Sequence, residues 1–216
     1  MDIAGALTAD HIKFLFKGFL VTLEVAAIAI VLSFIIAVVI GTIRYMKIPV
    51  LSQILGAIVE IIRNLPLLLI IFFTFFALPE VGIQMTIMGA AITALTVFEA
   101  AMISEIVRSG LNSVEKGQIE AGRSSGLNYI QTLWHIVLPQ GLRRMVPPMV
   151  SQFISLLKDT SLAVVIALPE LMHNAQVINA QNVNYIIPVF VFVALMYWIV
   201  NFTLSKVAKR LELKVT

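Results

Sequence analysis

The sequence contains no cysteine and few charged residues, and each shortage excludes a class of protein. Without cysteine the chain cannot form a disulfide framework, a thiolate metal site or a thiol nucleophile. Only 12% of its 216 residues are charged, whereas about 25% are charged in an ordinary soluble domain. Hydrophobic residues make up 60% of the chain, more than a soluble fold of this size can bury. The composition therefore indicates a membrane protein.

Two further patterns are missing. The N-terminal stretch has Asp2 and Asp10 ahead of any apolar run, so it lacks the basic, apolar and small-residue order of a cleavable signal peptide. The first apolar segment is therefore expected to remain as a membrane span. The sequence also has no Gly-x-x-x-x-Gly-Lys-Ser/Thr motif, so we do not expect this chain to hydrolyse ATP. The three histidines lack metal-ligand spacing, and no basic, aromatic-rich surface predicts nucleic-acid binding.

Five apolar segments approach the roughly 20 residues that a helix needs to cross a bilayer core of about 30 Å. They cover approximately residues 19–43, 54–78, 87–107, 145–168 and 185–204. The second is the least regular, because Glu60, Arg63 and Asn64 interrupt its first part and Pro66 is expected to kink it. We predict an all-α polytopic membrane protein that forms a single membrane-embedded domain over residues 1–216.

Positive charge predicts how these spans are oriented. If the connection after the first span is cytoplasmic, 11 of the 15 Lys and Arg residues lie on the cytoplasmic side and only Lys13 and Lys17 lie outside. Basic residues concentrate in cytoplasmic connections of membrane proteins. The N-terminus is therefore expected outside, and the C-terminus in the cytoplasm.

A basic stretch between the third and fourth segments has a regular pattern. Its marked positions are Glu120, Ala121, Gly126, Ile136, Leu138 and Pro139. Apolar residues then recur at spacings of three and four, as on one face of a helix, at Ile130, Leu133, Trp134, Val137 and Leu138. Gly126 is suited to a helix end with positive φ. The pattern predicts two short cytoplasmic helices, within residues 112–139, that form a docking surface.

This stretch resembles the EAA loop of permease subunits of binding-protein-dependent ABC importers, whose pattern is E-A-A, three residues, G, nine residues, I-x-L-P. Gly122 stands where the pattern has its second alanine. Four other stretches resemble the polar amino-acid branch of that family, namely residues 63–68, 104–110, 139–144 and 158–162. The alternative interpretation is an amphipathic hairpin that lies on lipid headgroups.

The resemblance implies the membrane-spanning permease subunit of an ATP-driven importer for polar amino acids, of the glutamine and glutamate group, in the bacterial cytoplasmic (inner) membrane. It implies no cofactor in this chain, because ATP and magnesium are bound by a separate ATPase. The implied partners are a second permease chain, identical or similar, two ATP-binding subunits and an extracytoplasmic amino-acid-binding protein. The loop of such importers fits a groove on the ATPase, which implies that Glu120 and Gly126 lie at that contact.

Four polar residues within the predicted spans are candidates for binding the transported amino acid, namely Asp159, Gln152, Ser155 and Glu99. Ionisable groups at membrane depth are costly and usually face a cavity or a partner. Gln152, Ser155 and Asp159 share one helix face. We expect Asp159 to pair with the α-ammonium group and Gln152 to bind the remainder. The alternative for Asp159 is an ion pair with Lys158, or across helices, that holds the bundle together.

Glu99 has two interpretations: it either lines the transport path or makes a structural hydrogen bond to a neighbouring helix. The remaining charges near the spans are expected to form ion pairs. Glu105 and Arg108, at i and i+3, predict an ion pair, and so do Glu60 and Arg63. Two rival functions remain open: an ion-coupled carrier or channel that needs no ATPase, and a membrane scaffold that transports nothing.

Overall fold

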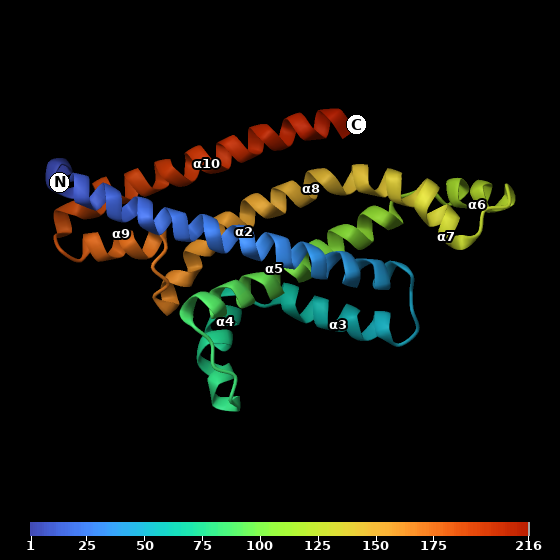
Figure 1. The fold of residues 1–216 in the computed structure, drawn as a ribbon, viewed down its shortest axis with the longest axis horizontal. Helices are drawn as coiled ribbons and strands as arrows, with labels where there is room; N and C mark the ends of the chain where they lie inside the picture. The colour runs from blue at the N-terminus through green and yellow to red at the C-terminus, as the bar shows by residue number, and fades with distance from the viewer. Residues whose placement is uncertain (216) are drawn as a thin grey trace.

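The computed structural model describes the backbone of residues 1–215 and the side chains of residues 1–210, and the described chain is helical (Figure 1). Its α-helices are α1 (Ile3–Ala6), α2 (Ala9–Tyr45), α3 (Leu51–Asn64), α4 (Leu67–Phe72), α5 (Ile87–Asn112), α6 (Lys116–Ser124), α7 (Tyr129–Thr132), α8 (Leu138–Asp159), α9 (Leu171–Asn179) and α10 (Ile186–Val215). Short π- or 3₁₀-helical turns connect them at η1 (Phe73–Ala77), η2 (Leu78–Val81), η3 (Leu133–Val137), η4 (Thr160–Ile166) and η5 (Val183–Tyr185). The predicted all-α class is confirmed.

Four helical segments of the described chain are long and apolar enough to cross a membrane: Ala9–Tyr45, Ile87–Asn112, Tyr129–Ile166 and Val183–Arg210. A fifth candidate is a bent pair, Leu51–Asn64 with Leu67–Val81, whose axes differ by 105°. The helices extend beyond the apolar runs seen in the sequence, since α2 begins at Ala9 and α10 continues to Val215.

The break between α3 and α4 lies at Leu65 and Pro66. Leu65 has extended backbone angles, φ −89° and ψ 142°. A residue that precedes proline disfavours the helical conformation, because the proline ring clashes with its backbone. The sequence predicts a kink here, whereas the structure has two separate helices, and α4 turns away from the long axis of the bundle (Figure 1).

The long helices α2 and α5 pack along a stripe of small residues. On α2 this stripe is fully or almost fully buried and recurs every fourth residue, at Ala29, Ser33, Ala37 and Gly41. A Cβ atom built on Gly41 would lie 2.7 Å from the carbonyl oxygen of Ser104, so only glycine fits this approach. Small residues let membrane helices approach closely. The opposite face of α2 presents apolar side chains to lipid, at Val31, Ile35 and Val39.

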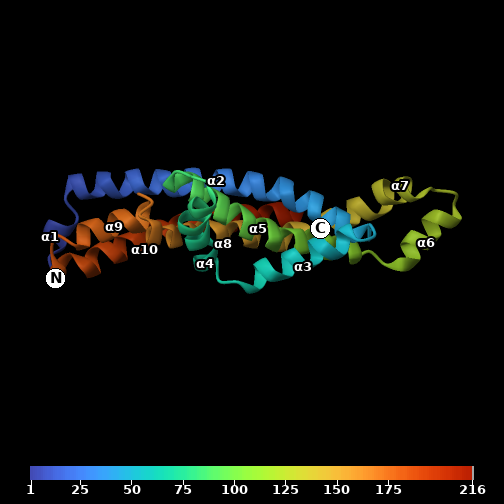
Figure 2. The same ribbon diagram turned by 90° about the horizontal axis from the view of Figure 1, so that it is seen from below.

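The bundle is elongated and its two ends differ. At the N-terminal end, α1 and α9 pack with α2 and α10, while α6 and α7 project from the opposite end (Figures 1 and 2). Between the ends, α5 and α8 lie side by side and run in opposite directions (Figure 1). Polar groups that face this α5–α8 contact therefore lie inside the bundle.

Candidate functional site

Glu99 and Gln152 meet inside the bundle, on α5 and α8. The Nε2 of Gln152 donates a hydrogen bond of 3.2 Å to Oε2 of Glu99. Glu99 is 0% exposed, and its Oε1 has no hydrogen-bond partner among the described residues. Buried polar atoms are nearly always paired, so an unpaired carboxylate oxygen is the kind of group that a ligand or water satisfies. The predicted hydrogen bond of Glu99 to a neighbouring helix is thus present, and its partner is itself a predicted site residue.

Asp159 and Ser155 lie further along α8, away from the hairpin end. Asp159 is half-buried at the last residue of α8, about 10 Å along the axis from Gln152. No ion pair joins it to Lys158 among the described side chains, and Lys158 is exposed. The structure thus brings Gln152 to Glu99, while Asp159 lies about two helical turns away from Gln152 on the same helix.

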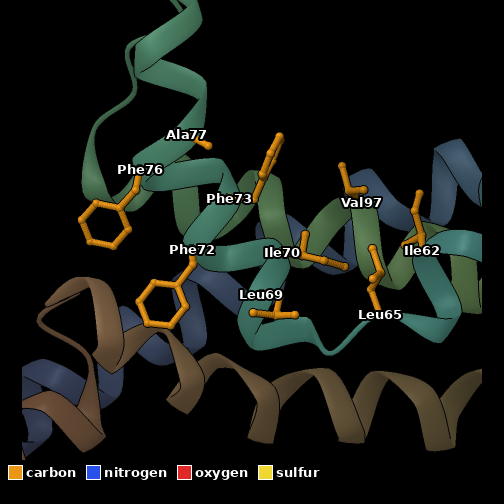
Figure 3. A pocket seen from close by; sticks show the side chains of 9 residues that line it. All are labelled: Ile62, Leu65, Leu69, Ile70, Phe72, Phe73, Phe76, Ala77 and Val97. Atoms are coloured by element: carbon orange, nitrogen blue, oxygen red, sulfur yellow. The ribbon is translucent and has the colours of Figure 1, made fainter.

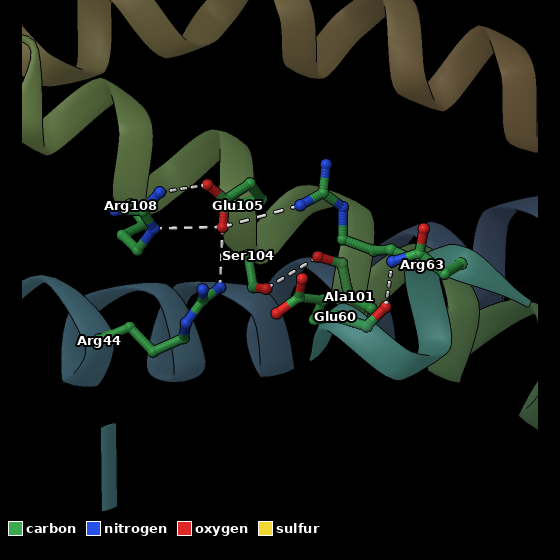
Figure 4. A network of polar contacts seen from close by, with 8 residues as sticks. Arg44, Glu60, Arg63, Ala101, Ser104, Glu105 and Arg108 are labelled. Carbon is green, nitrogen blue, oxygen red and sulfur yellow. Dashed lines mark hydrogen bonds and ion pairs between the residues drawn. The ribbon is translucent and has the colours of Figure 1, made fainter. Parts of the chain in front are cut away.

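Three arginines surround Glu105, six residues along α5 from Glu99 (Figure 4). Arg44 of α2 donates to Oε2 at 2.9 Å, and Arg108 binds both carboxylate oxygens. Arg63 of α3 is further away, 3.9 Å from Oε2. The predicted Glu105–Arg108 pair is confirmed. The predicted Glu60–Arg63 pair is wrong, because Arg63 turns toward Glu105.

A polar cavity of about 320 Å³ lies between α3, α5 and α8. Its polar lining residues are Arg63, Glu105, Ser109, Ser113, Arg144 and Gln152. Residue numbers rise along α5 and fall along α8 toward the hairpin, so the cavity extends from Gln152 to the base of the hairpin, while the fully buried Glu99 does not line it. We call it the polar cavity below.

In the hairpin of α6, α7 and η3, the residues of the sequence pattern differ in how exposed they are. Glu120, Ala121, Gly126 and Pro139 are exposed. Ile136 and Leu138 are partly buried, and both lie in or just beyond η3, which continues directly into α8. Any force on the hairpin is therefore applied to one end of the helix that holds Gln152.

Local interactions explain the shape of this hairpin. Gly126 has φ +90°, as its predicted role as a helix end requires, and the amide of the next residue, Leu127, donates to the carbonyl of Gly122 at 3.2 Å. Asn128 and Gln131 cap α7 reciprocally. A Cβ atom on Gly122 would lie 2.3 Å from Cδ1 of Ile136, so glycine at this position lets α6 approach η3.

An apolar groove lies on the outer side of α3, α4 and α5 (Figure 3). Its volume is about 780 Å³, and it is lined by Ile62, Leu65, Leu69, Ile70, Phe72, Phe73, Phe76, Ala77 and Val97. Phe73 is 63% exposed and Phe76 is 54% exposed. Large apolar side chains gathered in a groove favour lipid or a second protein surface as the neighbour.

Sequence reasoning missed Glu170, which is fully buried near the N-terminal end of the bundle. It caps α9 and accepts hydrogen bonds from the amide of His173 at 2.7 Å and from the hydroxyls of Thr22 and Tyr197, each at 3.3 Å. Burial raises the pKa of this carboxyl, and the hydrogen bonds that it accepts oppose the rise. Its position directly before an apolar helical run was the available signal, since acidic side chains are favoured at helix N-termini.

Comparison with known proteins fits this architecture. The family described as the binding-protein-dependent transport system inner membrane component matches residues 29–216. The chain belongs to this family, and it is a membrane transport component and not an enzyme.

Individual relatives narrow the class. The chain is 66% identical, over the full length of both chains, to the probable glutamine ABC transporter permease protein GlnP of Bacillus subtilis (strain 168). It is 35% identical to the L-cystine transport system permease protein TcyB of the same organism, over 90% of this chain and 83% of that one. Its fold matches the crystal structure of an amino acid ABC transporter with histidines, with a TM-score of 0.89 at 24% identity and 95% coverage of both chains.

Proposed function

We propose that this chain is the permease subunit of an ATP-driven importer whose cargo is glutamine or a closely related polar amino acid. The observation that carries this proposal is the Glu99–Gln152 pair, a fully buried carboxylate beside an amide, with one oxygen that has no partner among the described residues. Such a pair can accept an ammonium group and hydrogen-bond an amide side chain. The high identity to a probable glutamine permease supports the same cargo class.

The proposed orientation places the hairpin and the C-terminus in the cytoplasm and the N-terminus outside. The support is the distribution of basic residues, with 11 of 15 on the hairpin side of the spans. Asp159 then lies toward the outer end of α8, with Ser155 and Gln152 following it inward on the same helix. We propose that Asp159 contacts the ammonium group first and that Glu99 and Gln152 hold the cargo deeper in the bundle.

The proposed importer contains a second permease chain, identical or similar to this one, two ATP-binding subunits and an extracytoplasmic receptor. The exposed apolar groove of α3 and α4 supports a neighbour within the membrane, and the exposed Glu120, Ala121 and Gly126 support docking of an ATPase. Ile136, Leu138 and Pro139 would pass its movement into α8. ATP and magnesium belong to the ATPase, and this chain is proposed to need no cofactor.

The experiment is reconstitution of the permease with its ATPase and receptor, followed by measurement of glutamine uptake and receptor-stimulated ATP hydrolysis. We expect Glu120→Lys and Gly126→Val to uncouple the two activities, because the first reverses a charge at the contact and the second forces a β-branched residue to φ +90°. Glu115→Lys is the matched control, since Glu115 is also exposed but is the N-cap residue of α6, more than one helical turn before Glu120.

Two results would contradict this assignment. Normal uptake and normal ATP hydrolysis in both hairpin variants would remove the docking role. Uptake by the permease alone under an ion gradient would favour the rival function, a secondary carrier.

A further inference from the structure

The polar cavity lies next to groups of opposite charge, as a zwitterion requires. Gln152 lines it and donates to the carboxylate of Glu99, which is fully buried and is not itself a lining residue. Toward the hairpin, Arg63 and Arg144 line the same cavity. Its volume of about 320 Å³ falls within the range of roughly 300–1,000 Å³ that is usual for small-molecule sites.

Glu105 does not neutralise all the positive charge at the hairpin end of the polar cavity. Glu105 is one carboxylate among three guanidinium groups, and Arg44 and Arg108 make hydrogen bonds to it. Arg63 reaches it only at 3.9 Å and makes no side-chain hydrogen bond among the described residues. The side chain of Arg63 is 38% exposed and lines the cavity, so its N–H donors are available. Arg144 is more engaged, since it donates to the carbonyl of Ser113.

We propose that Arg63 binds the α-carboxylate of the amino acid as the cargo moves from Glu99 and Gln152 toward the cytoplasm. A guanidinium group presents a planar pair of donors that matches a carboxylate. The ammonium and carboxylate groups of every α-amino acid share one carbon atom, so a path that offers first an anion and then a cation recognises the part that all amino acids have in common. Side-chain preference is then left to the rest of the path.

An anionic lipid headgroup is the competing occupant of Arg63. It would use the positive end of the cavity alone and would gain nothing from the Glu99–Gln152 end, which repels a phosphate. Gln152 both lines the cavity and donates to Glu99, and this proximity to a carboxylate favours an amino acid. The inference rests on the proposed function. Its test distinguishes an amino acid from a lipid headgroup as the occupant, and it also distinguishes failure of the Arg63 role from failure of the proposed function.

The test is equilibrium binding of radiolabelled L-glutamine and of L-glutaminamide, which lacks the carboxylate, to the permease–ATPase complex in lipid nanodiscs. We expect wild-type protein to bind glutamine at least about tenfold more tightly than the amide. Arg63→Gln should weaken glutamine binding by about tenfold or more and leave the amide unchanged. Arg63→Lys keeps the charge and should retain part of the difference. Arg143 is exposed and adjacent in sequence to Arg144, but it does not line the cavity. Arg143→Gln should therefore leave the binding of both ligands unchanged.

Equal loss of both ligands in Arg63→Gln, or loss of neither, would overturn the assignment. If Arg63→Gln changes only the response of the complex to phosphatidylglycerol in the nanodisc, the occupant is a lipid phosphate and the proposal is wrong. If Arg63→Gln binds glutamine normally while Glu99→Gln does not, only the role of Arg63 fails. If wild-type complex binds no glutamine, the proposed function fails and the role of Arg63 fails with it.

Discussion

Glu99 and Glu105 stand six residues apart on the same helix, yet their surroundings are opposite. Glu105 is partly exposed, and three arginines from α2, α3 and α5 surround it. Within the described part of the chain, Glu99 is fully buried, accepts a hydrogen bond from one neutral amide and keeps one oxygen unpaired. A carboxylate with surplus cations around it is already satisfied and joins helices. A buried carboxylate with an unpaired oxygen can still accept a hydrogen bond from a ligand, and we assign Glu99 to cargo binding for this reason.

Glu105→Gln is the variant for which we expect the largest loss of stability, because Glu105 is the acid with charged partners. The change leaves Arg44, Arg63 and Arg108 close together without their shared anion. We expect a loss of about 2–4 kcal/mol, between the values for exposed and buried ion pairs. Thermal unfolding of the purified complex measures it. Glu60→Gln is the control, since Glu60 is exposed and unpaired among the described side chains. Equal unfolding temperatures for the two variants would contradict the structural role.

Asp159→Asn tests a third kind of acid, which is half-buried and has no ion pair among the described side chains. If Asp159 meets the ammonium group, its loss should lower uptake at low glutamine concentration by roughly ten- to a hundredfold, as expected for about 1.5–3 kcal/mol. Assembly should be normal. The double variant with Lys158→Gln is decisive: recovery of transport in it would show that the two residues form a structural pair and that Asp159 does not bind cargo.

Gln152→Ala should have the smallest effect. It removes one amide hydrogen bond to Glu99 and one to the cargo, while the carboxylate that we assign to the ammonium group stays in place. We expect a shift in preference among amino acids of up to about tenfold, measured by competition against labelled glutamine uptake. A uniform loss for all amino acids would instead indicate that Gln152 only positions Glu99.

The fold was largely predictable, because it depends on local patterns. Apolar runs locate the spans, and Gly126 marks the end of α6. The break at Leu65 and Pro66 was predictable as a kink, but its angle of 105° depends on how α4 packs against α5 and η4, which the sequence does not reveal.

The site was less predictable, because its contacts cross between helices. Gln152 and Glu99 are 53 residues apart, and Arg44 and Glu105 are 61 apart. Helical spacing relates residues three or four positions apart, and it therefore favoured a Glu60–Arg63 pair that the structure replaces with Arg63–Glu105. The same reasoning placed Gln152 and Asp159 on one face of a helix but could not show which of them meets α5.

The most direct test of the central claim is glutamine binding to the purified permease–ATPase complex with Glu99→Gln. The substitution keeps the size of the side chain and removes the charge that would receive the ammonium group. We predict that glutamine affinity falls roughly ten- to a hundredfold while the thermal unfolding temperature of the complex is unchanged or higher, since a buried charge has been removed. Unchanged affinity at normal assembly would contradict the claim that Glu99 binds the cargo.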